Sequence, residues 1–340
     1  MTPFFLGLSG TTLTDDERAL FRACDPSGYI LFGRNIIDRD QVRALTDDLR
    51  TLTGRDTLPI LIDQEGGRVA RLGPPFWPHF PAAAAFDRLY EIAPATAIAA
   101  ARANATAIAL TLADLGISVD CAPVLDIRHP DTHAAIGDRA YGADPLRVAA
   151  LGRATIAGLR DGGVAAVLKH MPGQGRASVD SHHDLPVVSA TAADLARDMA
   201  PFVALADAPM GMTAHTVYPA WDAGLPATLS PTVIDTIIRR DIGFDGLLMT
   251  DDIVMGALSG SLIARSEAAL AAGCDIVLHC SGIFADMATL ADKLGGTITA
   301  IAKTRLDRAM ERTGAPTTKE SLAEALARRD AYLALDPVTA

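Results

Sequence analysis

Short apolar runs recur along the chain and alternate with amphipathic segments, and this alternation limits the fold more than any other feature of the sequence. A short, continuously apolar run is typical of a strand that is buried on both faces. Eight such runs occur, at residues 4–8, 29–32, 59–62, 118–123, 165–168, 211–213, 247–250 and 276–278. Helical patterns lie between them, at 15–23, 39–52, 94–115, 146–161, 192–205 and 231–240. Eight strands that alternate with helices predict an α/β fold, a single (β/α)8 barrel; the main alternative is an open, doubly wound sheet.

The length and the absence of linkers favour one domain. The chain has 340 residues, and no fixed-period repeat or Ser/Gly-rich or Pro-rich linker divides it. We therefore expect a single catalytic domain over residues 1–340. Its charged, alanine-rich tail, about 303–335, is expected to form closing helices.

Composition excludes several classes of partner. The net charge of -11 makes nucleic acid and an anionic membrane surface poor partners, because both need a basic face. The four cysteines lack the spacing of a zinc site, and nothing requires an oxidising compartment. Residues 1–10 lack the features of a signal peptide, and no run of about 18 uninterrupted apolar residues predicts a membrane span. We expect a cytoplasmic protein.

Charged residues follow six of the eight predicted strands, at the end where a barrel of this kind carries its active site. They are Asp63, Asp126, Lys169 with His170, His215, Asp251 with Asp252, and His279. The alternative at each position is a loop cap or a salt bridge at the barrel rim, and it stays open for Asp126 and His279 in particular. Together they predict a polar site at this rim.

The segment that begins at Asp63 reads Asp-Gln-Glu-Gly-Gly-Arg-Val-Ala-Arg and ends at Arg71. Two glycines let the backbone turn sharply beside a ligand. Carboxylate and guanidinium groups together suit a polyol, because each can engage neighbouring hydroxyls in pairs. The alternative is that Glu65 and Arg68 pair with each other.

Two further segments carry residues suited to catalysis. A Gly- and Pro-containing loop follows the fifth strand and includes Asp180 and His182. Asp180 can accept a hydrogen bond from one ring nitrogen and so fix the tautomer; the alternative is a turn capped by Asp180 with a solvated His182. Asp251 ends the seventh strand, a rigid position that suits a nucleophile. Asp252 is expected to cap the next helix.

At these positions the chain resembles a known family, the single-domain β-N-acetylhexosaminidases of glycoside hydrolase family 3 that take part in bacterial cell-wall recycling. The matching segments come in the family's order along the chain. They are residues 30–35, 62–71, 122–126, 136–142, 169–182, 212–215 and 243–252.

The resemblance implies a retaining hydrolase that forms a covalent glycosyl-enzyme and releases terminal β-linked GlcNAc, with peptidoglycan-derived muropeptides as the suggested substrate. It implies Asp251 as nucleophile and His182, paired with Asp180, as acid/base. The sugar-binding positions that it implies are Asp63, Arg71, Arg139, Lys169 and His170. The partner is then a small carbohydrate, and neither a metal nor an organic cofactor is required.

The chain departs from the family pattern at two positions of the loop after the fifth strand. Gln174 stands where the family has His, and Met171 stands where Phe is common. Gln keeps the capacity to form hydrogen bonds but cannot titrate. Three alternatives therefore stay open: a family 3 barrel with another sugar specificity or with glycoside phosphorylase activity, a non-catalytic sugar-binding relative, and an unrelated phosphate-handling barrel. The late strands lack the Gly-rich loop that the last would need.

Overall fold

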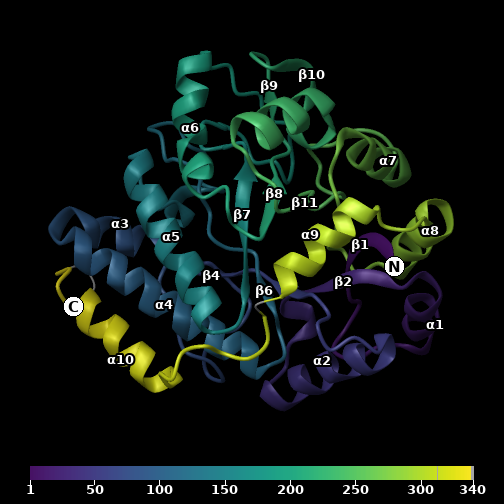
Figure 1. Ribbon diagram of the computed structural model, residues 1–340, viewed down its shortest axis with the longest axis horizontal. Helices are drawn as coiled ribbons and strands as arrows, with labels where there is room; N and C mark the ends of the chain where they lie inside the picture. The colour runs from purple at the N-terminus through teal and green to yellow at the C-terminus, as the bar shows by residue number, and fades with distance from the viewer. Residues whose placement is uncertain (312, 338–340) are drawn as a thin grey trace.

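The computed structural model describes residues 1–311 and 313–337, and its centre is a ring of eight parallel strands (Figure 1). The strands are β1 (Thr2–Gly7), β2 (Pro26–Leu31), β3 (Ile60–Ile62), β6 (Val119–Asp120), β7 (Ala165–Met171), β8 (Met210–Thr213), β11 (Leu247–Met249) and β12 (Val277–His279). They pair in the order β11-β8-β7-β6-β3-β2-β1-β12. A bridge between Met249 and Ile276 joins the two ends of this order. The predicted (β/α)8 barrel is confirmed, and the open-sheet alternative is wrong.

Helices surround the ring. They are α1 (Asp15–Cys24), α2 (Arg39–Thr53), α3 (Ala83–Ile92), α4 (Pro94–Asp114), α5 (Pro145–Asp161), α6 (Ala192–Ala204), the π-helix η4 (Val233–Asp241), α7 (Leu262–Ala272), α8 (Phe284–Leu294), α9 (Ala300–Met310) and α10 (Leu322–Leu333). Each of the six helical segments predicted between the strands overlaps one of these helices, whereas α3, α7 and α8 were not predicted.

Several short elements lie in the loops that connect the strands and helices. In the part of the chain that the structure describes, β4 (Gln64–Gly66) pairs antiparallel with β5 (Val69–Ala70), and β9 (Val217–Tyr218) with β10 (Asp222–Pro226). The 3-10 turns described there are η1 (Gly33–Asn35), η2 (Gly137–Arg139) and η3 (Ala227–Leu229).

Local sequence signals set several helix ends. Thr14 and Glu17 form a capping box at the start of α1, in which each side chain accepts a hydrogen bond from the other residue's N–H. Asp38 caps the start of α2, and Gly54 ends that helix with a φ of 64°, a conformation that glycine adopts without strain.

The interior of the barrel is closed at the N-terminal ends of the strands by α9. Strand residues such as Phe5, Ile30 and Leu61 form one buried cluster with side chains of α9, including Leu306 and Met310. Figure 1 shows α9 lying across the strands at the centre of the view. The opposite, C-terminal ends of the strands are thus the end of the barrel that is open to a ligand.

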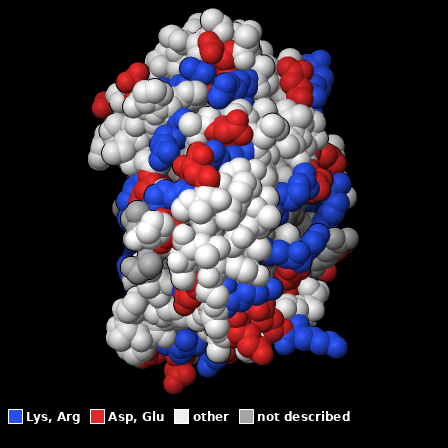
Figure 2. Space-filling model, turned by 90° about the vertical axis from the view of Figure 1, so that its left-hand side faces the viewer, with Lys and Arg blue, Asp and Glu red and all other residues white. Residues whose placement is uncertain are grey.

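The helix α4 is long and apolar enough, by length and composition, to cross a membrane, but 67% of its most apolar stretch is buried inside the protein. It packs against α5 and α10. Its composition therefore needs no explanation beyond packing in the outer helical layer. Figure 2 shows basic and acidic side chains interspersed on this side of the molecule, and Arg102 of α4 pairs with Asp161 of α5 at 2.7 Å.

Candidate active site

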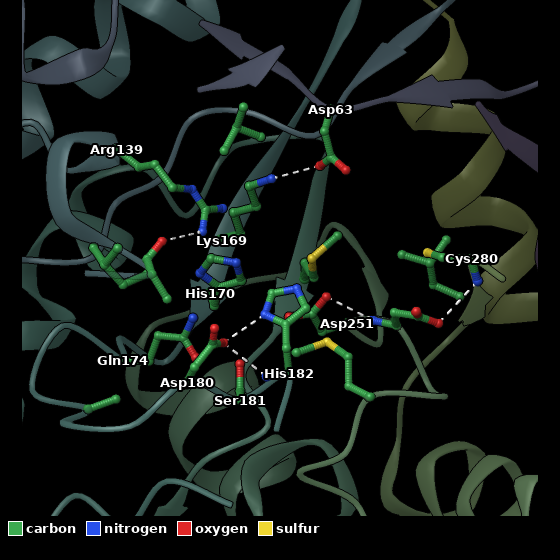
Figure 3. Close-up of a pocket in the computed structure, with 18 of the residues that line it drawn as sticks. Asp63, Arg139, Lys169, His170, Gln174, Asp180, Ser181, His182, Asp251 and Cys280 are labelled. Atoms are coloured by element: carbon green, nitrogen blue, oxygen red, sulfur yellow. Dashed lines mark hydrogen bonds and ion pairs between the residues drawn. The ribbon is translucent and has the colours of Figure 1, made fainter. Parts of the chain in front are cut away.

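A pocket of about 360 Å³ opens at the C-terminal ends of the strands, and the polar residues singled out in the sequence converge on it (Figure 3). This volume is in the range of small-molecule sites. The eight predicted site residues all line it: Asp63, Arg71, Arg139, Lys169, His170, Asp180, His182 and Asp251.

One wall of the pocket rests on a group of five ion-paired residues, here called the cradle: Asp63, Glu65, Arg71, Arg139 and Lys169. Four of them line the pocket, and Glu65 lies behind it, bound to Arg139 and Lys169. Lys169 Nζ lies 2.9 Å from an Asp63 oxygen and 2.7 Å from a Glu65 oxygen. Arg139 binds both Glu65 oxygens, at 2.7 and 2.8 Å, and Arg71 lies 3.1 Å from Asp63. Two carboxylates face three cations, so the cradle carries one net positive charge.

The charges of the cradle keep its carboxylates ionised. Burial raises the pKa of Asp63, but the positive charges of Lys169 and Arg71 outweigh burial and hold this pKa well below its usual value. Burial likewise raises the pKa of Glu65, and Arg139 and Lys169 bring it down to about 2. Charged oxygens and nitrogens in fixed positions can bind ring hydroxyls in pairs.

Glu65 was not among the predicted site residues, and the suggested pair of Glu65 with Arg68 is wrong. Arg68 binds Asp138, at 2.9 Å, while Glu65 binds Arg139 and Lys169. Glu65 lies on β4, close after β3, and meets Arg139 of η2 from 74 positions away, a contact that sequence spacing alone does not reveal.

His170 is held by a buried carboxylate. Its Nδ1 lies 2.7 Å from Asp126 Oδ2, and Asp126 Oδ1 accepts a hydrogen bond of 2.8 Å from the Gln174 N–H. Asp126 is fully buried and does not line the pocket, so it acts on the pocket through His170. A carboxylate behind a histidine fixes the ring's orientation and its tautomer.

Replacing Asp126 tests this arrangement. We expect Asp126→Ala to raise KM on the order of tenfold, with a smaller change in kcat, because the His170 ring loses its orientation. Steady-state kinetics measure the effect. In a His170→Ala background the same substitution should add little. A full additional loss in that background would mean that Asp126 acts independently of His170.

Asp251 lies at the floor of the pocket, directly after β11. One of its oxygens accepts a hydrogen bond of 2.8 Å from the Asp252 N–H. Burial raises the pKa of Asp251, but the nearby His170 and His215 and this hydrogen bond outweigh it, so the net pKa lies below the usual value. Asp251 is therefore an ionised carboxylate on a rigid strand end.

Asp252 does not cap the next helix, contrary to expectation. Ser261 caps α7. Asp252 Oδ1 instead accepts hydrogen bonds from the N–H groups of Cys280, at 3.0 Å, and Val254, at 3.3 Å. Burial raises the pKa of Asp252 to about 6. Its role is to tie the end of β11 to the end of β12.

Asp180 and His182 form a hydrogen-bonded dyad at the mouth of the pocket. Asp180 Oδ1 lies 2.7 Å from His182 Nδ1 and also accepts a hydrogen bond from the His182 N–H, at 3.0 Å. Asp180 thus caps the turn and also binds the His182 ring. The sequence offered these two interactions as alternatives, and the structure contains both. Burial opposes ionisation of Asp180, but these hydrogen bonds outweigh burial and lower its pKa. The His182 side chain is 63% exposed.

The loop that carries this dyad, residues 172–188, is fixed to the rest of the barrel at several places, and two of them bear on the site. Near the dyad, Gly256 N–H donates to the His182 carbonyl at 3.1 Å, and Ala257 N–H donates to the Ser181 carbonyl at 3.2 Å. At its base, Gly175 lies so close to Ile127 that an added Cβ would meet the Ile127 carbonyl oxygen at 1.8 Å. The first contact joins the dyad's loop to the loop after Asp251.

Two strand-end histidines do not reach the pocket. His215 is fully buried; its Nδ1 lies 2.7 Å from Thr228 Oγ1 and its Nε2 lies 3.0 Å from the Asp252 carbonyl. His279 is also fully buried and lies 3.1 Å from Ser281. For these two residues the expectation of a position in the site is wrong. Gln174, the departure from the family pattern, does line the pocket.

Comparison with known proteins agrees with this site. Residues 8–314 match the family described as "Glycosyl hydrolase family 3 N terminal domain". A β-hexosaminidase of Alkalilimnicola ehrlichii is 41% identical over 286 residues, which cover 82% of this chain and 80% of the relative. A β-hexosaminidase of Bordetella avium is 38% identical over 284 residues, with the same coverage.

Solved structures give the same result. Native NagZ from Neisseria gonorrhoeae has a TM-score of 0.86 and 31% identity, over 98% of this chain and 97% of that one. The same enzyme in complex with N-trifluoroacetyl-D-glucosamine has a TM-score of 0.84 and 32% identity, over 100% of this chain and 98% of that one.

A (β/α)8 barrel with an ion-paired polar pocket at its strand ends, similar over most of its length to these enzymes, is a glycoside hydrolase. The chain belongs to glycosyl hydrolase family 3, among its β-hexosaminidases, as the resemblance in the sequence implied.

Proposed function

We propose that this enzyme is a retaining β-N-acetylhexosaminidase that releases terminal β-linked GlcNAc from peptidoglycan-derived muropeptides through a covalent glycosyl-enzyme. One observation carries the proposal: an ionised carboxylate, Asp251, and a histidine–carboxylate dyad, His182 with Asp180, line the same pocket as the cradle. The cytoplasmic location stays a prediction.

The chemistry follows from these positions. Asp251 attacks the anomeric carbon and forms an ester with the sugar, while His182 gives its Nε2 proton to the leaving oxygen. In the second step His182 Nε2 takes a proton from water, whose oxygen attacks the anomeric carbon and releases Asp251. Asp180 stays on Nδ1 throughout, which keeps Nε2 as the nitrogen that exchanges protons.

The cradle and His170 bind the ring hydroxyls of the sugar in this proposal. Contacts from such fixed charges lower the barrier if they tighten when the ring becomes oxocarbenium-like. The related Neisseria gonorrhoeae enzyme, in its complex with N-trifluoroacetyl-D-glucosamine, supports a 2-acylamido sugar as the bound unit.

The stereochemistry of the first product tests the mechanism. A covalent ester on Asp251 requires two displacements at the anomeric carbon, so the first-formed GlcNAc should be the β-anomer. Proton NMR during early turnover of an aryl β-GlcNAc substrate distinguishes the anomers before they equilibrate. An initial α-anomer would show inversion and overturn the glycosyl-enzyme. The same reaction in phosphate buffer should give free GlcNAc, and a sugar phosphate as the main product would make the enzyme a phosphorylase.

A further inference from the structure

A second, smaller cavity lies behind the cradle, between the barrel and the helices α4 and α5. It has room for about one water molecule. Arg139 lines both this cavity and the sugar pocket, and Glu65, its ion-pair partner in the cradle, lines the cavity, so this pair separates the two spaces. The other polar residues that line it are Gln64, Asn104, Asp120, Tyr141 and Thr155.

Asp120, on β6, is the unusual member of this group. Its side chain is fully buried, and Oδ1 accepts a hydrogen bond of 3.0 Å from the Gln64 N–H. Oδ2 is buried and has no hydrogen-bond partner among the residues that the structure describes. No ion pair to Asp120 occurs among those residues, although Lys169 is nearby. A buried carboxylate with one oxygen unsatisfied is costly, whereas a carboxylic acid can donate its proton to a water.

The charges around Asp120 favour the neutral form. Titratable and charged groups face it from the end of β3 and from β4, from η2 and the residues after it, from the end of β6 and from β7. They are Asp63, Glu65, Arg139, Tyr141, Cys121 and Lys169. Burial raises the pKa of Asp120 to about 7, with the Gln64 N–H and Lys169 acting against burial and the carboxylates of Asp63 and Glu65 adding to it.

We propose that Asp120 is a positioning residue of the cradle, which acts as a neutral carboxylic acid and donates from Oδ2 to a water held in the cavity behind Glu65 and Arg139. With Asp120 neutral, the cradle keeps its single net positive charge, and Lys169 stays bound between Asp63 and Glu65. Ionised Asp120 would repel both of those carboxylates and attract Lys169. Substrate hydroxyls that Lys169 binds would then be held less well.

The substitution Asp120→Asn mimics the neutral acid, because an amide can accept from Gln64 N–H and donate to the water. Thermal unfolding gives the first readout, which does not depend on the proposed function. Below about pH 4, the ordinary pKa of an aspartate, the Asp120 carboxyl is neutral in both the folded and the unfolded protein. Its ionisation then has no effect on the free energy of unfolding, and the substitution removes no pH-dependent cost. Between pH 4 and 7 the unfolded carboxyl is ionised and the folded one is not, so native stability falls as pH rises.

We therefore expect Asp120→Asn to be more stable than the native protein, by a margin that grows from pH 4 to pH 7 and then levels off. The ratio of the two unfolding constants should change by up to about tenfold per pH unit in that window. The matched control is Asp275→Asn, at another buried carboxylate, which is paired with Arg239 at 2.8 Å and Arg305 at 3.0 Å. This control should lose stability at neutral pH.

Infrared spectra give a second readout. The difference spectrum, native minus Asp120→Asn, should show a protonated carboxyl C=O stretch at pH 6 that weakens above pH 7, because bands of other protonated carboxyls such as Asp252 cancel in the difference. The third readout, the KM for an aryl β-GlcNAc substrate, rests on the proposed function. The ratio of native KM to Asp120→Asn KM should rise on the order of threefold between pH 6 and 8, since other titrations cancel in the ratio.

A stability margin that does not vary with pH, or a difference spectrum without the carboxyl band, would overturn the neutral acid. If those two readouts agree with the proposal but the KM ratio is flat, Asp120 is a neutral acid without a positioning role, and the proposal fails in that part. If the native enzyme has no activity on aryl β-GlcNAc, that result counts against the proposed function and not against the neutral acid.

Discussion

The variant Asp251→Ala should fold as the native protein does and lose nearly all turnover, at least about 10⁴-fold in kcat, because no covalent intermediate can then form. Asp251 makes one hydrogen bond, from the Asp252 N–H, and no ion pair among the described residues, so its removal should leave the barrel intact. Circular dichroism and thermal unfolding check the fold, and kinetics with an aryl β-GlcNAc substrate check the loss.

A 5-fluoro-glycosyl reagent gives the direct test. It should trap the native enzyme, and peptide mass analysis should find the sugar on Asp251. The neighbouring Asp252→Asn is the matched control. Because an Asn oxygen can still accept from the N–H groups of Val254 and Cys280, and burial already disfavours the ionised form of Asp252, this variant should keep both its fold and its trapping. An adduct on Asp252, or on a glutamate, would overturn the assignment of the nucleophile.

The second large effect is expected at His182. General acid/base catalysis contributes roughly 10² to 10⁴ in rate, so His182→Ala should lose about that much on a substrate with a poor leaving group. The first step with dinitrophenolate as leaving group should be far less affected, because this group needs little protonation. Added azide should then restore part of the turnover by attacking the glycosyl-enzyme without a base.

Two variants on the same loop separate the roles of its residues. Asp180→Ala should show a smaller loss of the same kind, because Asp180 holds the His182 ring at 2.7 Å without exchanging a proton with the substrate. His183→Ala should be mild, since His183 is exposed and does not line the pocket. A large loss of kcat in His183→Ala, together with almost no loss in His182→Ala, would place the acid/base one residue later. If both were silent, the acid/base would lie elsewhere.

The strands could be predicted from the sequence because each is buried on both faces, which produces an uninterrupted apolar run. All eight predicted runs overlap a strand of the ring. The helices α3, α7 and α8, each of 10 or 11 residues, were missed. Short helices are stabilised mainly by tertiary packing, here in the outer layer, and their own sequences do not record that packing.

The site could be predicted in outline, because a barrel brings all strand ends to one rim. The sequence could not be used to predict which of those residues reach the pocket. His215 and His279 follow strands as Lys169 does, yet both side chains are buried away from the pocket. Glu65 and Arg139 lie 74 positions apart, and their contact depends on the path of two loops. Sequence spacing carries no information on such a contact.

The position of α9 has a consequence for how the chain is made. Every residue assigned to the chemistry precedes position 252, but the apolar interior of the barrel is sealed by a helix at 300–310. During synthesis from the N-terminus, all the catalytic residues are made before the helix that covers Phe5, Ile30 and Leu61. The last part of the chain therefore governs solubility and folding yield, and a truncation there would harm an enzyme whose catalytic residues are all present.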